Sequence, residues 1–394
     1  MGVYFLTLDK NDCCGCGGCV NICPKDAIGM EADEYGFVYP RIDGQKCVDC
    51  RLCHKICAQV GENNSAMPLK ALAGSHKNKD ALLKSSSGGV FYALAEHIIE
   101  IGGVVCGCIM DENLKVMHIC ADNAEDCLKI RKSKYVQSDM GLVYRQVKKL
   151  LSQGKQVLFT GTPCQIAALY AVVGRKYENL TTMDLICHGV PSQLLFDKFI
   201  QYLEGRYQTR IVAFDFRSKK FGWKRFSMEF TDENRRTVNI GKAREFFIPA
   251  FTGGNIIRPN CLSCKYASPN RIGDITIGDF WGYEKVKLQC DTAYGTSVFT
   301  INTENGKKWL TVLQEKLVCQ EIDYDIAVSR NTCLHKPTPK GNKREQYLQA
   351  IRDDKIPEIA QQYRQRNLKK RIGERVRHAM PIPVFQFLHN LTTK

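Results

Sequence analysis

The chain has 394 residues, of which 20 are cysteine, and its 56 Lys and Arg against 41 Asp and Glu give a formal net charge of +15. The length excludes a small disulfide-stapled scaffold, and a hydrophobic content of 44% excludes a disordered or collagen-like chain. Twenty thiols are also too many for an ordinary enzyme of a reducing compartment, so we expect the cysteines to have a chemical role.

The first twelve residues, MGVYFLTLDKND, have neither the basic start nor the small-residue cleavage site of a secretory signal. Two Glu and a His interrupt the longest apolar region, residues 90–110, too soon for a membrane span. Cysteine clusters without an export signal are typical of metal sites in a reducing compartment. We therefore expect a cytoplasmic protein.

The motif Cys-x2-Cys-x2-Cys-x3-Cys occurs twice in the first 57 residues. It is the ligand run of two-cluster bacterial ferredoxins, in which three thiolates hold one [4Fe–4S] cube and the fourth reaches the other. The spacing predicts one cluster on Cys13, Cys16, Cys19 and Cys57, and a second on Cys47, Cys50, Cys53 and Cys23. Two zinc sites are the alternative, although zinc favours paired Cys-x2-Cys knuckles. Cys14 is expected to be a bystander.

A polar stretch followed by Met-Pro predicts a linker at 63–68, which separates a domain at 1–62 from the rest. Apolar runs then alternate with helical patterns, as in βαβ units. We expect strands at 104–110, 156–160, 180–187, 274–278 and 296–302, helices at 90–100, 142–153, 165–173, from 191 and at 306–316, and antiparallel strands within 209–240. These elements predict an α/β domain at 69–335 with a β-rich insertion.

Four dispersed cysteines fall near strand ends of this domain: Cys164, Cys187, Cys261 and Cys264. Loops that follow parallel strands converge at one edge of a sheet, so these thiols can complete a third [4Fe–4S] cluster. Buried, inert thiols are the alternative. The remaining seven cysteines, at 106, 108, 120, 127, 290, 319 and 333, have no ligand-like spacing.

Residues 336–394 read as a basic helical tail, because 340–394 contains 13 Lys and Arg against 5 Asp and Glu. Residues 363–378 are basic and residues 381–391 are apolar. A solvated helix or a docking arm for a partner is the favoured interpretation. Peripheral contact with an anionic membrane is the alternative.

Six motifs occur in a fixed order: SSGG at 86–89, KYVQS at 134–138, GTPCQ at 161–165, CHG at 187–189, the Cys261–Cys264 pair and DITIGDFW at 274–281. Together they resemble the beta subunit family of coenzyme F420 hydrogenase/dehydrogenase, over roughly residues 2–335. The fold class is then an α+β ferredoxin-like domain with two [4Fe–4S] clusters, an α/β flavin domain with a β-rich insertion, and the tail.

The resemblance implies FAD, with a third [4Fe–4S] cluster on the four dispersed cysteines. The candidate phosphate or flavin-edge contacts are Ser86, Ser87, Gly88 and Gly89, which precede the helix at 90. From the residues alone, a simple capped helix start explains them as well. Tyr135, Gln137 and Ser138 are candidates to contact the flavin ring, and Thr160, Gly161 and Thr162 to close its far side.

We expect an FAD-dependent iron–sulfur oxidoreductase that passes electrons between a reduced carrier (coenzyme F420 or ferredoxin), FAD and the clusters. An electron-transfer subunit without its own substrate site is the alternative. Candidate catalytic residues are His188, Asp279 and Lys220, the last in a cationic segment at 217–224 suited to an anionic substrate. Partners are a redox protein or carrier and an unknown organic substrate. Nucleic acid is not expected, because three clusters and FAD carry about −8 and offset the charge of the body.

Overall fold

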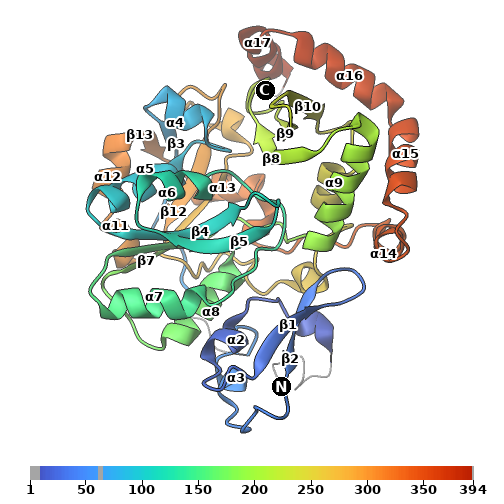
Figure 1. Cartoon of the computed structure of the whole chain (residues 1–394). Coiled ribbons are helices and arrows are strands. Elements are labelled where there is room, and N and C mark those ends of the chain that lie inside the picture. The colour runs from blue at the N-terminus through green and yellow to red at the C-terminus, as the bar shows by residue number, and fades with distance from the viewer. Residues whose placement is uncertain (1–8, 61–64, 393–394) are drawn as a thin grey trace.

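The computed structural model describes residues 9–60 and 65–392. Figure 1 shows an N-terminal segment at one end, a large sheet covered by helices in the middle, and a small sheet with the C-terminal helices at the other end. Residues 1–8 and 61–64, which include part of the predicted first domain and the start of the predicted linker, lie outside the described residues. The rest of that linker pairs with the body, since Ala66 forms a β-bridge with Arg271.

The N-terminal segment repeats one pattern twice. Its two cysteine runs lead into the short helices α2 (Gly18–Ile22) and α3 (Leu52–Lys55), and a hairpin of β1 (Ile28–Ala32) and β2 (Val38–Ile42) lies between them. Helix α2 packs on α7 and α8 of the large domain. The segment is therefore docked on the α/β body.

The large sheet has eight strands. From edge to edge they are β13 (Leu317–Glu321), β3 (Lys70–His76), β12 (Ser297–Ile301), β11 (Ile275–Asp279), β7 (Leu180–Leu185), β6 (Val157–Gly161), β4 (Val104–Met110) and β5 (Val116–Ala121). The four strands β11, β7, β6 and β4 are parallel, and the outer strands pair antiparallel. Strand β6 is buried along its whole length, as expected of a parallel strand covered on both faces.

Helices cover both faces of this sheet. Alternate residues of β4 and β6 pack on α7 (Val143–Ser152) and α8 (Pro163–Val173), while the intervening residues pack on α5 (Val90–Glu100). The other helices around the sheet are α4 (Lys79–Leu83), α6 (Ala124–Ile130), α11 (Glu304–Lys307), α12 (Leu310–Lys316) and α13 (Tyr324–Ser329). The carboxyl ends of the parallel strands are left open for a ligand.

The insertion is a three-stranded antiparallel sheet with its own aromatic core. It comprises β8 (Ile211–Ser218), β9 (Ser227–Asp232) and β10 (Thr237–Gly241), flanked by α9 (Gln193–Tyr207) and α10 (Phe247–Thr252). Phe196 and Phe199 of α9 contact Phe214, Phe216 and Phe247 edge-on or tilted. This core fixes the sheet beside the open strand ends.

Four helices form the C-terminal part: α14 (Arg344–Arg352), α15 (Ile356–Arg366), α16 (Leu368–Ala379) and α17 (Ile382–Thr392). They run past α9 and over the small sheet, and α16 and α17 end at the side of the molecule opposite the N-terminal segment (Figure 1). Within residues 9–60 and 65–392, none of the helices has the length and apolar content to cross a bilayer.

Two expectations about elements need correction. The single helix expected at 306–316 is two helices, α11 and α12, separated by a turn at residues 308 and 309. The strand expected at 180–187 ends at Leu185, so Cys187 lies in the following loop. In contrast, β4 and α5 have the expected bounds.

Candidate functional site

A cavity of about 280 Å³ opens at the carboxyl ends of the parallel strands. Its lining comes from the ends of β6, β7 and β11, from the loop before α5 and from the loop after α6. Eight of the ten predicted flavin contacts line it: Ser86, Ser87, Gly89, Tyr135, Ser138, Thr160, Gly161 and Thr162. The fold thus brings residues from three distant segments to one cavity.

The other two predicted flavin contacts lie elsewhere. Gly88 packs against strands, because a Cβ there would stand 2.3 Å from the carbonyl oxygen of Gly74 and 2.5 Å from Ser297 N. Gln137 is drawn toward the N-terminal segment, where its amide donates to the carbonyl oxygens of Cys14 and Gly15 at 3.1 and 3.2 Å. The close approach of the neighbouring backbone leaves room only for a glycine at position 88. The Gln137 side-chain amide binds the loop that contains Cys14 and Gly15.

The cavity wall contains cations that sequence reasoning missed. Arg131 is buried there and Lys134 is half-buried, and both donate only to backbone carbonyls and Ser85, without a hydrogen-bonded carboxylate in the described part of the chain. Burial lowers the pKa of Lys134 to about 8. Two cations without an ion-pair partner suit a doubly charged pyrophosphate.

His118 adds a neutral acceptor to the wall. Its Nε2 lies 3.1 Å from the carbonyl oxygen of Thr160 and donates to it, and burial lowers the pKa of the ring to about 4. Its Nδ1 is buried without a hydrogen-bond partner among the described residues. An orphaned acceptor beside two cations fits a ligand that has both anionic groups and N–H or O–H donors.

An ion pair ties the small sheet to β11 at the edge of the cavity, whose lining includes Asp279. The Arg217 guanidinium donates to both carboxylate oxygens of Asp279 at 2.8 and 3.1 Å, and Trp223 Nε1 donates to the same carboxylate at 2.9 Å. Asp279 therefore lines the cavity with its side chain held by Arg217 and Trp223. Arg217 also donates to the Tyr135 hydroxyl at 3.0 Å.

The predicted cationic segment 217–224 is mostly committed to contacts within the protein. Lys219, next to Arg217, donates to the carbonyl oxygens of Leu82 and Ser87 at 2.8 and 2.6 Å and so holds the loop before α5. Lys220 is exposed and outside the cavity lining, so the structure does not place it at the site. The neighbouring Lys219 is the lysine that supports the cavity.

His188 lines the cavity, and its Nδ1 lies 3.5 Å from the buried thiol of Cys333. Thr338, at the start of the C-terminal part, donates to the His188 carbonyl oxygen at 2.8 Å. These contacts fix the loop that follows β7. Sequence spacing missed Cys333, because its partner is 145 residues away.

Each predicted ferredoxin ligand set lines a cavity of its own. Cys13, Cys16, Cys19 and Cys57 surround one, and Cys23, Cys47, Cys50 and Cys53 surround another. The grouping has the predicted crossover, with the last cysteine of each run joining the other set. Backbone amides approach the sulfurs, since Gly15 N donates to Cys13 Sγ and Ala27 N to Cys23 Sγ at 3.4 and 3.3 Å.

The two runs share one backbone conformation. Gly15 and Gly17 have φ of +66° and +72°, and the equivalent Asp49 and Arg51 have φ of +48° and +56°. A left-handed conformation at a non-glycine residue costs free energy and persists where the surroundings require it. The two runs therefore share their cysteine spacing and also a loop conformation that points the thiols and backbone amides inward.

The four dispersed cysteines also converge. Cys164, Cys187, Cys261 and Cys264 line a third cavity, together with Cys14 and Cys16 of the first run. Cys164 lies in the first turn of α8, where the helix dipole favours a negatively charged group. Gly189, with φ of +110°, brings the loop after β7 close to Cys261, because a Cβ there would be 3.0 Å from the Cys261 Cβ.

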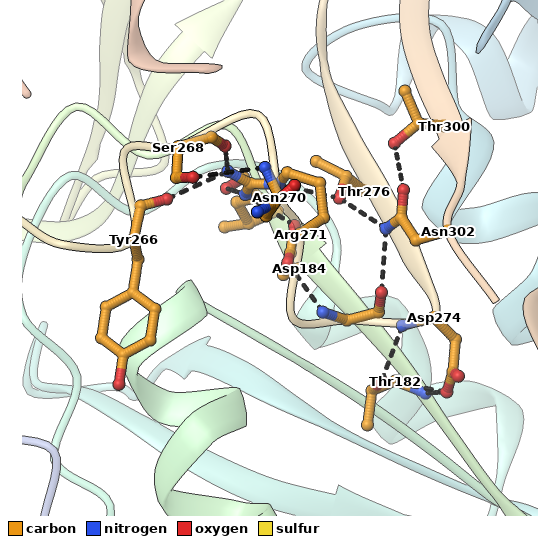
Figure 2. Close-up of polar contacts among 12 residues, drawn as sticks. Thr182, Asp184, Tyr266, Ser268, Asn270, Arg271, Asp274, Thr276, Thr300 and Asn302 are labelled. Atoms are coloured by element: carbon orange, nitrogen blue, oxygen red, sulfur yellow. Dashed lines mark hydrogen bonds and ion pairs between the residues drawn. The ribbon is translucent and has the colours of Figure 1, made fainter. Parts of the chain in front are cut away.

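Figure 2 shows the buried polar network that joins the two loops carrying these cysteines. Arg271 donates to Asp184 Oδ1 at 2.9 Å, and both side chains are buried. The same guanidinium donates to the carbonyl oxygens of Tyr266 and Ser268, just after Cys264, and of Leu185, just before Cys187. One side chain therefore sets the distance between the two loops.

The network continues into the sheet. Gly273 N donates to Asp184 Oδ2 at 3.0 Å, and Asn302 of the segment after β12 donates to the Gly273 carbonyl oxygen at 2.8 Å (Figure 2). Asp274 accepts from Thr182 N and Oγ1 of β7 at 2.8 and 3.0 Å. The loops after β7 and before β11 are thereby anchored to the core of the fold.

Cys14 lines both the first and the third cysteine cavity. It is buried and lies between the two sets of thiols. In the described part of the chain, no three His, Cys, Asp or Glu side chains are placed as around a single metal ion. The thiolates around a [4Fe–4S] cube lie farther apart than the ligands of a single metal ion, so cysteines placed for a cube do not form such a group.

Two arginines dock the cysteine-rich segment on the body. Arg258, which is fully buried, donates to the carbonyl oxygens of Cys13 and Val38 and to Gln137. Arg145 of α7 donates to the carbonyl oxygens of Val20 and Cys23 at 3.1 and 2.6 Å. The first and third cysteine cavities are therefore held at a fixed separation.

Residues 154–325, which contain all four dispersed cysteines and Asp279, match the family model for the C terminus of the coenzyme F420 hydrogenase/dehydrogenase beta subunit. This part of the chain is similar to that beta subunit family. Residues 6–29 match the model of a 4Fe-4S binding domain. The family predicted from the sequence motifs is thus confirmed, and the protein is an iron–sulfur electron-transfer protein related to these beta subunits.

Individual relatives of this chain come from methanogens. The coenzyme F420-dependent sulfite reductase of Methanocaldococcus jannaschii is 24% identical over 327 residues, which cover 80% of this chain and 48% of that protein. An uncharacterized protein of the same organism is 26% identical over 203 residues, covering 44% of this chain and 56% of its own length. The chain spans about half the length of these curated relatives.

An uncharacterized polyferredoxin-like protein of the same organism is 35% identical over 71 residues, covering 16% of this chain and 42% of that protein. Among solved structures, a chain of the F420-reducing nickel–iron hydrogenase complex from Methanosarcina barkeri, studied with xenon, aligns with a TM-score of 0.43 and 16% identity. That alignment covers 79% of this chain and 95% of the hydrogenase chain.

Proposed function

We propose that this chain is an iron–sulfur flavoprotein oxidoreductase. It passes electrons between a reduced carrier (coenzyme F420 or ferredoxin), FAD in the cavity at the strand ends, and three [4Fe–4S] clusters on the three cysteine sets. When bound, the flavin exchanges a two-electron hydride for single electrons, and the clusters carry these onward. The donor, the acceptor and the direction of flow depend on partners outside the chain.

The proposal rests on one observation: neighbouring cavities share lining residues. Thr162, Gln165, Cys187, Gly189 and Val190 line both the flavin cavity and the cavity of the dispersed cysteines. Cys14 and Cys16 line both the latter cavity and that of the first ferredoxin set. The candidate cofactor sites thus form one continuous series from the flavin cavity into the N-terminal segment.

The residues of the chain have distinct roles along this series. Arg131 and Lys134 bind the anionic part of the dinucleotide, while His118 and the Ser86 and Ser87 loop accept or donate hydrogen bonds to it. Tyr135, stacked on Phe251 at 4.8 Å between ring centroids, forms an apolar wall for the ring. Arg271 is a positioning residue, because it contacts the cysteine loops and not the cofactor cavity.

The test is anaerobic purification followed by iron, sulfide and flavin analysis and an absorption spectrum. We expect about twelve irons and one flavin per chain. Eight irons with flavin would contradict the third cluster alone, and a colourless protein would contradict the proposal. Reduced coenzyme F420, NADH and reduced ferredoxin, each offered to the pure protein, then identify the donor.

An electron-transfer subunit without its own substrate site is the second candidate. The length of one relative favours this candidate. The F420-dependent sulfite reductase matches this chain over only 48% of its own length, so about half of that protein has no counterpart in the match. A larger partner would then supply the substrate site. In this case the pure chain contains flavin and clusters but oxidises none of the three donors alone, and turnover returns only with a partner present.

A further inference from the structure

Helix α16 presents its apolar side chains to solvent and buries an acidic side chain against the protein. Leu368, Ile372 and Val376, spaced four residues apart on one side of the helix, are each more than half exposed. On the inward side, Glu374 is only 2% exposed. A surface helix of a globular protein normally has the opposite orientation. We therefore expect another molecule to cover the exposed apolar stripe.

Polar contacts hold the helix in this orientation. Glu374 accepts from Ala243 N at 3.1 Å beside β10, and His378 stacks on Phe221 with ring centroids 4.1 Å apart. Arg225 of the small sheet donates to the carbonyl oxygens of Arg377 and Met380 at the end of α16. The body therefore fixes the helix through its polar side and leaves the apolar stripe exposed.

Helix α17 continues the pattern. Val384, Phe387 and Leu388 are exposed, with Phe387 at 65%. On the inward side, Gln386 donates to the Tyr283 hydroxyl and to Thr292 Oγ1 at 2.7 and 3.0 Å. Two consecutive helices thus expose apolar side chains while polar side chains attach them to the body.

The charges around the stripe are positive. Lys369 and Arg375 lie next to it on its two sides at 100° per residue, and Lys370 and Arg377 are also exposed. Glu374 is the sole carboxylate between residues 368 and 392, and it is buried. An apolar stripe with cationic borders and no exposed carboxylate is complementary to a surface of anionic headgroups over acyl chains.

We propose that α16 and α17 dock this protein on the surface of an anionic lipid bilayer, with the stripe of Leu368, Ile372 and Val376 and the exposed side chains of α17 inserted at the interface. A redox protein is the less suitable occupant, because these helices lie at the opposite end of the molecule from the N-terminal segment with the ferredoxin cysteines (Figure 1). Docking through the tail leaves that end free for electron exchange. The inference does not depend on which cofactors are bound.

The test is co-sedimentation of the full-length protein with vesicles of phosphatidylcholine, with and without phosphatidylglycerol. We expect binding to the anionic vesicles that weakens as salt is added, and little binding to neutral ones. The triple variant Leu368→Gln, Ile372→Gln, Val376→Gln should bind the anionic vesicles at least tenfold more weakly. The double variant Lys369→Gln, Arg375→Gln should lose about fivefold per cation.

The matched control is Lys176→Gln with Lys287→Gln, which removes the same charge from exposed positions elsewhere and should bind as the parent does. Because every changed side chain is exposed, the thermal midpoint and absorption spectrum should not move. A parent protein that ignores anionic vesicles, or a triple variant that binds equally well, would overturn the proposal. A triple variant that instead turns a dimer into a monomer would assign the stripe to a second copy of the chain.

Discussion

Arg131 is buried beside the cavity and forms no ion pair with a carboxylate in the described part of the chain. Its guanidinium lies over the Tyr92 ring at 3.8 Å and donates to a carbonyl oxygen, beside the cavity assigned to FAD. We expect Arg131→Gln to raise the dissociation constant for FAD at least tenfold, because a charge-assisted hydrogen bond to phosphate contributes about 1.5–3 kcal/mol. Fluorescence titration of the flavin-free protein with FAD measures this.

The control for this change is Arg175→Gln, which removes an arginine that stacks on Tyr177 at 4.3 Å, away from the cavity. It should bind FAD as the parent does. Equal dissociation constants for the parent and Arg131→Gln would mean that Arg131 does not contact the phosphates. An unchanged thermal midpoint would exclude a folding defect as the cause of weak binding.

Lys219 predicts a pH dependence of stability. Burial, with the neighbouring Arg217, lowers the pKa of Lys219 to about 7, whereas an unfolded lysine titrates near 10.5. Between these pKa values the unfolded chain binds one more proton than the folded chain, so the free energy of unfolding rises with pH, by at most about 1.4 kcal/mol per unit. Below the folded pKa the full destabilisation from burying the ammonium is present, and above the unfolded pKa it is absent.

The measurement is urea unfolding of the flavin-free protein and of Lys219→Met across this pH range. The stability of the parent relative to Lys219→Met should increase from neutral to alkaline pH. Subtracting the variant removes the titration of all other groups. A difference that stays constant with pH would show that Lys219 has an ordinary pKa in the folded protein.

The Arg271–Asp184 pair connects elements, since it ties the loop after β7 to the loop before β11. Arg271→Met leaves a buried carboxylate unpaired, which typically costs about 3–5 kcal/mol. We expect a lower thermal midpoint and the loss of about four irons per chain, because the loops with Cys187 and Cys264 are no longer held together. Arg41→Met, at an exposed ion pair with Glu31, should change neither quantity. Full iron content in Arg271→Met would contradict its positioning role.

The sequence predicted those elements whose signal is local. Strand β4 and helix α5 are apolar runs with clear periodicity, and the ferredoxin segment follows from cysteine spacing. Strands β3, β5 and β13 escaped prediction because they lie toward the edges of the sheet, where pairing with distant strands decides the structure. The helical pattern runs on through residues 308 and 309, so the sequence predicts one helix where the structure has two separated by a turn.

The same distinction applies to the site. Short motifs located Ser86, Tyr135 and Thr162, and the structure places all three at one cavity. Arg131 and His118 belong to no motif, and only the folded chain reveals that both are buried beside it, together with Lys134 of the KYVQS motif. Arg217 and Asp279 were each singled out from sequence, but for substrate binding and acid catalysis. That they form an ion pair with one another depends on the insertion folding back over the sheet.

At the scale of the whole molecule, one of the three cysteine sites reaches the surface. Cys47 and Cys50 are exposed, whereas the thiols of the other two sets are at least partly buried. The Cys23, Cys47, Cys50 and Cys53 site is therefore the natural exit for electrons in the proposed path, and its neighbours Val48 and Leu52 offer exposed apolar side chains to a partner.

This path predicts a separation between flavin reduction and delivery to an external acceptor. Cys50→Ala should lower the iron content by about four per chain, because one cube loses a ligand. The donor found in the panel should still bleach the flavin at the parental rate, since the flavin cavity lies at the other end of the series. Reduction of an added ferredoxin should fall at least tenfold. Stopped-flow absorbance follows both steps.

Cys290→Ala is the matched control, because Cys290 lines none of the three cysteine cavities and its thiol lies 3.8 Å from the Thr296 hydroxyl. It should keep full iron content and both rates. If Cys50→Ala delivers electrons to ferredoxin as fast as the parent, the electrons leave the molecule elsewhere. If flavin bleaching slows as well, the N-terminal segment supports the flavin cavity in addition to conducting electrons, and the two ends of the series are coupled through Arg258 and Gln137.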